Sequence, residues 1–213
     1  MIIKFQQLLP AYFSQQHQPS SGIWLTDLEL PQGELVEIVA PSGSGKTSLI
    51  HFMYGMRTDY NGSISYGKNE LRSMTPERMA ELRQTHVSIV FQDMRLFNTQ
   101  SVRVNIELKR QLAPHHNSNV INEMASRLGI YDKLDNLCGN CSYGEQQRIA
   151  VIRALMQPFS VLLLDEPFSH LDNKNAAAAL DLILEEAAAR KATVILADLE
   201  RTSRYPHTRL FYL

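Results

Sequence analysis

Residues 37–50 read EIVAPSGSGKTSLI, a polar, glycine-containing loop between two apolar segments. ELVEIVA at 34–40 predicts a buried strand, and TSLIHFMYGM at 47–56 predicts a helix. Between them, Gly43 and Gly45 let the backbone curl so that successive N–H groups point inward at the helix N-terminus. Strand, loop and helix therefore predict a cradle for an anion.

The lysine and threonine that follow the loop indicate that the bound anion is the phosphate of a nucleotide. Lys46 can reach the outer phosphates, and Thr47 places a hydroxyl where a phosphate-bound Mg²⁺ would lie. Ala40 takes the place of the first glycine in the pattern Gly-x-x-x-x-Gly-Lys-Ser/Thr, which an alanine can do only with a negative φ. The predicted ATP-binding loop consists of Ala40, Pro41, Ser42, Gly43, Ser44, Gly45, Lys46, Thr47 and Ser48.

A second motif, VLLLDEP at 161–167, complements the phosphate loop. Four apolar residues predict a buried strand that delivers Asp165 and Glu166 at its C-terminal end, where ligands bind in open α/β sheets. Asp165 can hold the magnesium, usually through water. Glu166 can orient and polarise a water for in-line attack on the γ-phosphate.

Composition limits the classes of function. The chain has 213 residues and 44% apolar residues, typical of one globular domain. With 21 Lys and Arg against 22 Asp and Glu, it lacks the basic character of nucleic-acid binding proteins, and no nucleic-acid partner is expected. No secretory leader and no apolar run near the ~18 residues of a membrane span are present, so we expect a cytoplasmic protein.

The two cysteines, Cys138 and Cys141, form the sequence CGNC. Cys-x-x-Cys can be a redox pair or half of a zinc site. A structural zinc needs two more ligands, and no second Cys-x-x-Cys or His-x₃₋₅-His follows. We interpret both cysteines as small apolar residues in a turn.

Strand and helix signals alternate along the chain, which predicts an α/β fold with a mostly parallel sheet covered by helices. Further strands are expected at 63–66, 86–92 and 192–198, and a helix at 175–190. Between 93 and 145 the strand signal fades, which predicts an inserted helical subdomain with helices at VRVNIELKRQL and NSNVINEMASRLGI. IIKFQQLL, with WLTDLEL and ELVEIVA joined by the PQGE turn, predicts a small antiparallel patch.

The motifs together resemble one family. VFQD (90–93), CSYGEQQR (141–148) and SHLD (169–172) are similar, in order and spacing, to the Q-loop, signature and D-loop of an ABC transporter ATPase. The resemblance covers essentially the whole chain and implies a P-loop NTPase core of 1–92 and 146–213 around the helical subdomain 93–145. ELRQTHVSIVFQDMRLFNTQSVRVNIEL is most similar to the branch serving lipoprotein release, macrolide efflux and FtsE-like cell division.

The resemblance implies further site residues. Tyr12, or failing it Phe13, would stack on adenine, and Gln92 would reach magnesium and the attacking water as a catalytic residue beside Glu166 and Lys46. Ser142-x-x-Glu145 is by itself a helix capping box. In the family this helix start faces the ATP of a partner subunit, so a homodimer would sandwich two ATPs through Ser142, Gly144, Glu145 and Asp172.

The chain departs from the family pattern at several positions. Cys141 and Tyr143 replace the usual Leu and first Gly of the signature, and His170 replaces a small D-loop residue. Ala197 stands where the family has a histidine that holds the γ-phosphate and the attacking water. Alanine cannot donate such a bond, so we expect slow hydrolysis unless another group, for example His170, substitutes.

The leading hypothesis is an ATP-hydrolysing subunit whose closure drives a separate transmembrane permease, contacted near Gln92 to Asn98, with Met94, Leu96 and Phe97 as the apolar surface. The protein would then lie on the inner face of the membrane. The alternative is an ATP-dependent regulatory dimer that gates a membrane partner with little hydrolysis. A soluble ABC protein of translation or DNA repair is a third hypothesis. Cargo and direction stay open.

Overall fold

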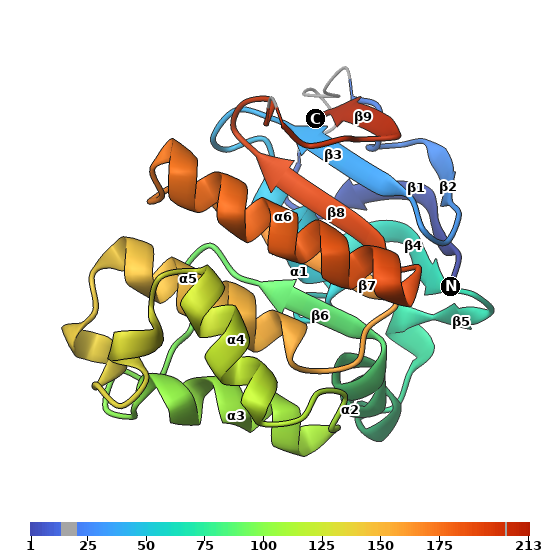
Figure 1. The fold of residues 1–213 in the computed structure, drawn as a ribbon. Coiled ribbons are helices and arrows are strands. Elements are labelled where there is room, and N and C mark those ends of the chain that lie inside the picture. The colour runs from blue at the N-terminus through green and yellow to red at the C-terminus, as the bar shows by residue number, and fades with distance from the viewer. Residues whose placement is uncertain (14–20, 203) are drawn as a thin grey trace.

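The central sheet of the molecule is parallel and has five strands (Figure 1). The structure, a computed structural model, describes residues 1–13, 21–202 and 204–213. The strand order is β6 (Val87–Val90), β7 (Val161–Asp165), β8 (Thr193–Asp198), β3 (Leu35–Val39) and β9 (Arg209–Tyr212). All four neighbouring pairs are parallel, so the C-terminal ends of β3, β6, β7 and β8 meet at one edge.

The two faces of this sheet carry separate hydrophobic cores. Leu162 and Leu164 pack with the helices α5 (Tyr143–Leu155) and α6 (Asn173–Arg190). Val161 and Leu163 point the other way, to the core that contains α1 (Lys46–Met53). Because successive strand residues face opposite sides, a continuous apolar run such as VLLL is what a strand covered on both faces requires. The expected α/β architecture is confirmed.

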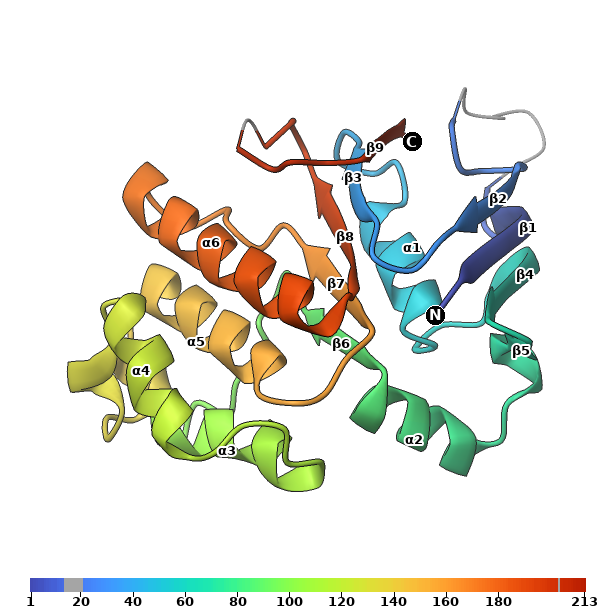
Figure 2. The ribbon, with the colours of Figure 1, turned by 45° about the vertical axis from the view of Figure 1, so that its right-hand side comes forward.

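A second, antiparallel sheet lies beside the first and has the order β2 (Asp27–Leu30), β1 (Ile3–Pro10), β4 (Tyr60–Tyr66), β5 (Asn69–Glu70). Figure 2 shows it beyond α1. The expected antiparallel patch exists, but the expected pairing of 24–30 with 34–40 is wrong, because β2 pairs with β1 while β3 enters the parallel sheet. Burial explains the separation: β2 is mostly solvated, and β3 is buried at its centre.

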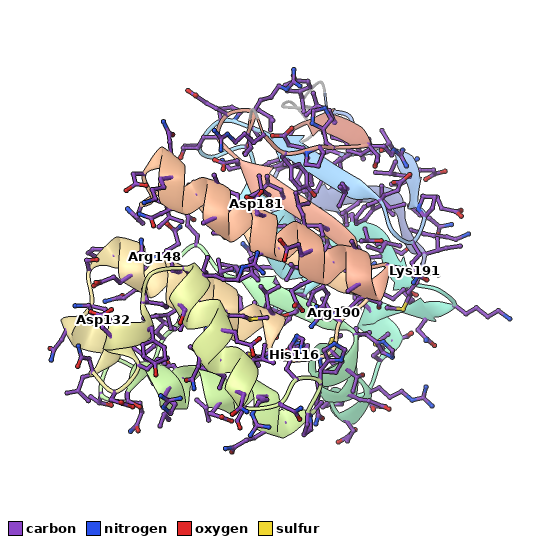
Figure 3. All side chains as sticks on the ribbon, viewed as in Figure 1. His116, Asp132, Arg148, Asp181, Arg190 and Lys191 are labelled. Atoms are coloured by element: carbon purple, nitrogen blue, oxygen red, sulfur yellow. The ribbon has the colours of Figure 1, made fainter. Side chains whose placement is uncertain are left out.

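Three helices gather at one end of the parallel sheet, where α3 (Val102–Leu112) and α4 (Asn119–Arg127) pack on α5. The loop between α3 and α4 is tied to α6. His116 Nε2 lies 2.8 Å from Glu186 Oε2 and 2.9 Å from an Arg190 nitrogen; Figure 3 shows His116 beside Arg190. Arg127 on α4 adds a paired contact with Glu185. The predicted helix at 102–112 coincides with α3, and the division into 1–92, 93–145 and 146–213 stays a prediction.

Two elements were not expected from the sequence. Helix α2 (Pro76–Thr85) buries only Leu82, so apolar periodicity cannot reveal it, although Thr75 accepts a capping bond from Arg78 and Pro76 begins the helix. Strand β9 consists of RLFY beside β3. Short 3₁₀ turns span Leu71–Ser73, Tyr131–Lys133 and Cys138–Asn140. Among the described residues, no helix is long and apolar enough to cross a membrane.

Candidate nucleotide site

The loop after β3 has the backbone that an anion cradle needs. Gly43 and Gly45 adopt positive φ values of 83° and 99°, whereas Ala40 does not, as its replacement of glycine requires. A Cβ on Gly45 would also lie 3.1 Å from the Trp24 ring. Lys46, the first residue of α1, is buried, and its Nζ donates to Ala40 O at 2.8 Å. The helix N-terminus and the ammonium group therefore meet at one point beside the loop.

Two acids at the end of β7 face this lysine. Glu166 Oε1 lies 3.4 Å from Lys46 Nζ, and both side chains are largely buried. Glu166 has a φ of 47°, in the left-handed region, while its N–H donates to Ala197 O at 2.9 Å. Such a backbone costs about 1–3 kcal/mol and persists only where its surroundings hold it. The turn thus directs the Glu166 carboxylate at the phosphate loop.

Asp165 is buried and its carboxylate is unpaired. Neither oxygen has a hydrogen-bond partner among the described residues, because the nearby Thr47 hydroxyl donates instead to Gln92 Oε1 at 3.3 Å. Burial raises the pKa of Asp165 to about 6, and Thr47 and Lys46 offset that shift only in part. A buried carboxylate without a hydrogen-bond donor is a suitable ligand for a hard cation.

Gln92 connects these groups from the end of β6. Its Nε2 donates to Glu166 Oε2 at 3.1 Å, and its Oε1 accepts from Thr47. The hydroxyl of Thr47, the amide oxygen of Gln92 and the carboxylate of Asp165 are the oxygen donors that Mg²⁺ prefers. The three residues predicted as metal ligands are therefore brought together, with the chemistry that fits the ion.

A cavity of about 340 Å³ lies over this cluster. Its lining residues are Tyr12, Ser42, Gly43, Gly45, Lys46, Thr47, Ser48, Gln92 and Glu166. Tyr12 is half exposed at its edge and donates from Oη to Ser48 Oγ at 2.7 Å. Phe13 instead packs its edge against Trp24 in the core. Of the two aromatic candidates, the structure therefore puts Tyr12 at the cavity.

The predicted partner-facing residues lie at two helix starts and do not line that cavity. Ser142 and Glu145 form a complete capping box: Glu145 N–H donates to Ser142 Oγ, and Ser142 N–H donates to Glu145 Oε2 at 2.7 Å. Asp172 caps α6 by accepting from Asn175 N–H, which lowers the pKa of Asp172. A Cβ on Gly144 would lie 2.9 Å from His170 O, so the signature and D-loop backbones are in close contact.

The positions that depart from the family pattern are also placed. Ala197 is fully buried at the end of β8, directly opposite Asp165. Tyr143 is 67% exposed, and its ring centroid lies 5.4 Å from that of His170. His170 does not line the cavity of its own chain. Any help that His170 gives to catalysis must therefore come across a dimer.

The segment after Gln92 corrects one expectation. Met94, expected as part of an apolar contact surface, is 6% exposed, whereas Phe97 is 57% exposed. Met94 and Arg95 have positive φ values of 57° and 50°, and this turn directs the Met94 side chain into the core. Leu96 is half-buried. The exposed apolar surface there is Phe97.

One residue beside the cavity, Arg57, belongs to none of the sequence motifs. Arg57, in the loop after α1, donates from Nη1 to Ser48 Oγ at 2.9 Å, and its Cζ lies 5.3 Å from the Tyr12 ring centroid. No pattern in MRTDY signals this contact, because it joins segments that only the fold brings together. The clue that the sequence offers is a basic residue directly after the first predicted helix.

The cysteines are free thiols in the fold. Both are buried, and burial raises the pKa of Cys138 to about 11. Such a thiol is protonated and a poor nucleophile or metal ligand. In the described part of the chain, no three His, Cys, Asp or Glu side chains are grouped so that they could hold a metal ion.

Comparisons with known proteins identify the family. A family model described as "ABC transporter" matches residues 25–169. The bacitracin export ATP-binding protein BceA of Halalkalibacterium halodurans is 30% identical over 80% of this chain and 68% of its own length. The macrolide export ATP-binding/permease protein MacB of Nitrosomonas europaea is 32% identical over 80% of this chain, which spans only 26% of that protein.

The fold is also that of a solved protein. The dimeric structure of the bacterial ABC transporter cassette MJ0796 superposes with a TM-score of 0.84, covering 99% of this chain and 94% of that one at 20% identity. The family model and the fold therefore point to the same family. The chain belongs to the ABC transporter family and is one of its ATP-binding cassettes, the ATPase domain of that family.

Proposed function

We propose that this cassette binds Mg-ATP in the cavity over Lys46 and uses ATP-driven dimer closure to power a membrane transporter or extraction complex. The observation that carries the proposal is the convergence of Lys46, Glu166 and Gln92 within 3.4 Å contacts beside a glycine-lined cradle. MacB and BceA are named for export, which supports a transport role.

Each residue has a definable task. Lys46, which now contacts Glu166, would exchange that contact for the outer phosphates of ATP. Thr47, Gln92 and Asp165 would hold magnesium, which neutralises charge on the transferred phosphate. Released from Lys46, Glu166 would orient the attacking water, with Gln92 holding the other side of its carboxylate. The exposed ring of Tyr12 would stack on the flat face of the base.

A second copy would complete the site. The N-terminus of α5 presents Ser142 and free N–H groups, an arrangement that attracts a phosphate. We infer that this helix start and the D-loop with Asp172 close over the ATP of the partner. Tyr143 adds a bulky exposed ring to this seam, and it would have to pack against the partner for closure.

Because Ala197 stands where the family has a histidine, we expect the rate of ATP hydrolysis to be low. No donor from the end of β8 can hold the γ-phosphate, and removal of one such donor costs about two to three orders of magnitude in rate. The alternative function, a regulatory dimer with little hydrolysis, is favoured by this observation and opposed by the intact Glu166, Gln92 and Asp165.

An exposed apolar stripe supports the partner prediction. On α3, Val104, Leu108 and Leu112 are 41%, 40% and 57% exposed at four-residue spacing, so they share one helix face. With Phe97 they form a surface that we propose as the docking site for a transmembrane permease subunit, slightly beyond the predicted Gln92–Asn98 segment. This would hold the protein at the inner membrane face.

The decisive experiment measures multiple-turnover Mg-ATPase activity and the oligomeric state with ATP. Turnover that is lost in Glu166→Gln supports the ATPase role, and an ATP-dependent dimer of Glu166→Gln supports closure. An ATP-dependent dimer without turnover selects the regulatory alternative. If the parent protein binds millimolar Mg-ATP no better than Lys46→Ala does, the proposal is contradicted. Purification from membranes in mild detergent would identify the permease.

A further inference from the structure

Arg57 contacts two residues that line the cavity, Ser48 and Tyr12. Its Nη1 donates to Ser48 Oγ, its Cζ stands 5.3 Å from the Tyr12 ring centroid, and its Cζ is 5.4 Å from the Phe52 ring. Its Nε donates to Asp59 Oδ1 at 2.9 Å. The guanidinium is therefore fixed on three sides, since both Asp59 oxygens bind it.

The Ser48 hydroxyl is the point where these contacts meet. Ser48 is 8% exposed, lies in the first turn of α1 and lines the cavity. Its oxygen accepts from both Tyr12 Oη, at 2.7 Å, and Arg57 Nη1, at 2.9 Å. A hydroxyl oxygen has two lone pairs and one proton, so both acceptor positions are used. Within the described residues no protein acceptor takes its proton, which can be donated into the cavity.

The cavity lining holds two groups of contacts. Lys46 contacts Glu166, whereas Tyr12 contacts Arg57. Ser48 is two residues after Lys46 and contacts both Tyr12 and Arg57. A nucleotide whose outer phosphates bind Lys46 would therefore place its inner phosphate near Ser48 and its base near Tyr12.

We propose that Arg57 is a nucleotide-positioning residue, which holds the Ser48 hydroxyl as a donor to the innermost phosphate and supports the Tyr12 ring against the base. This rests on the proposed function, because it takes the ligand to be a nucleoside di- or triphosphate. Arg57 acts through its neighbours, in both the ground state and the transition state. It should therefore affect affinity for ATP and ADP alike and leave the chemical step unchanged.

The test compares Arg57→Ala, Ser48→Ala and the double variant by titration with Mg-ATP and Mg-ADP. We expect Arg57→Ala to raise both dissociation constants by about tenfold, the size of one charged hydrogen bond. The double variant should lose less affinity than the sum of the two single losses, because both substitutions remove the shared Ser48 contact and only the Tyr12 contact is lost in addition. The KM for ATP should rise, whereas kcat should stay within about twofold of the parent value.

Arg72→Ala is the matched control. Arg72 also stacks on a tyrosine, with its Cζ 4.6 Å from the Tyr60 ring, and donates to Tyr60 O, but Tyr60 is not among the residues that line the cavity. Its affinity should equal that of the parent, and thermal unfolding of every variant checks the fold. Additive losses in the double variant, or an Arg57→Ala protein that binds like Arg72→Ala, would overturn the inference. Failure of the parent itself to bind better than Lys46→Ala would instead overturn the proposed function.

Discussion

The guanidinium group of Arg153 donates a 2.7 Å hydrogen bond to the carbonyl oxygen of Arg95. Arg153 lies on α5, the helix that begins at the signature, and Arg95 lies in the turn that follows Gln92. A second bond reaches Met94 O. Since both turn residues have positive φ, this one side chain holds a strained backbone in place. It links the helix that we predict to face a partner to the turn after Gln92, the predicted catalytic glutamine.

Replacement of Arg153 by Met should therefore loosen that link. The variant leaves two carbonyl oxygens without their donor in a buried place, which costs about 2–4 kcal/mol of unfolding free energy. Urea unfolding measures the loss. Arg153→Lys keeps the charge and one donor and should lose less. Equal stability of the Met variant and the parent would show that the turn does not need the contact.

Replacement of Asp165 by Asn should raise the stability of the fold and abolish ATPase activity. Burial raises its pKa to about 6 in the fold, above the ordinary value of 3.8. The folded state thus binds the proton more tightly, so the contribution of Asp165 to unfolding free energy falls as pH rises from about 4 to 6 and stays low above that. Asp165→Asn removes this penalty and should add about 2–3 kcal/mol at pH 7.5 without magnesium.

The same substitution removes a predicted magnesium ligand, so ATPase activity should disappear while the melting temperature rises. Thermal unfolding in EDTA at pH 4 and 7.5 measures the difference, which should shrink at pH 4. The exposed Asp181→Asn is the control, because Asp181 is not among the groups that shift the pKa of Asp165. A lower melting temperature for Asp165→Asn at pH 7.5 would mean that the carboxylate is stabilised in the fold.

Strongly patterned segments made much of this fold predictable. The continuous apolar runs of β7 and β8 and the phosphate loop carry their environment in their own residues. The amphipathic α3 does so by its spacing. Helix α2 was missed because it is polar nearly all round, and β2 was paired wrongly because a short turn does not decide which sheet a strand joins. Met94 was misplaced because positive φ at a non-glycine residue leaves no trace in sequence.

Site residues divide in the same way. Lys46, Asp165 and Glu166 belong to contiguous motifs whose chemistry is readable from residue types. Arg57 is nine residues from Ser48, and only the turn after α1 brings its guanidinium back to the helix start. Contacts of this kind depend on packing and not on spacing.

Ala197→His should accelerate hydrolysis. The position pairs with Asp165 across the sheet and is one residue before Asp198. A restored donor predicts a rise in kcat of about 10²-fold, up to 10³-fold. Ala197→Leu, which has bulk but no donor, should show no rise. If the histidine variant turns over no faster than the parent, another group already supplies this function, and His170 across the dimer becomes the candidate.

The capping serine allows helix stability and anion binding to be separated. Ser142→Ala removes an N-cap and should cost about 1 kcal/mol of unfolding free energy. Ser142→Asp keeps the cap, because aspartate also accepts from the backbone, but places a negative charge where we expect the partner's γ-phosphate. In a Glu166→Gln background with ATP, the Asp variant should be as stable as its parent and yet monomeric by size-exclusion chromatography.

Ser142→Ala should be less stable but dimerise at least partly, because the helix N–H groups that attract the phosphate remain. Glu145→Gln is the matched control, since glutamine can still accept from the Ser142 N–H and complete the box. A Ser142→Asp protein that dimerises with ATP as readily as its parent would place the phosphate of the partner away from this helix. The role of α5 would then be structural, and packing alone would account for the glycine at 144, because a Cβ there would lie 2.9 Å from His170 O.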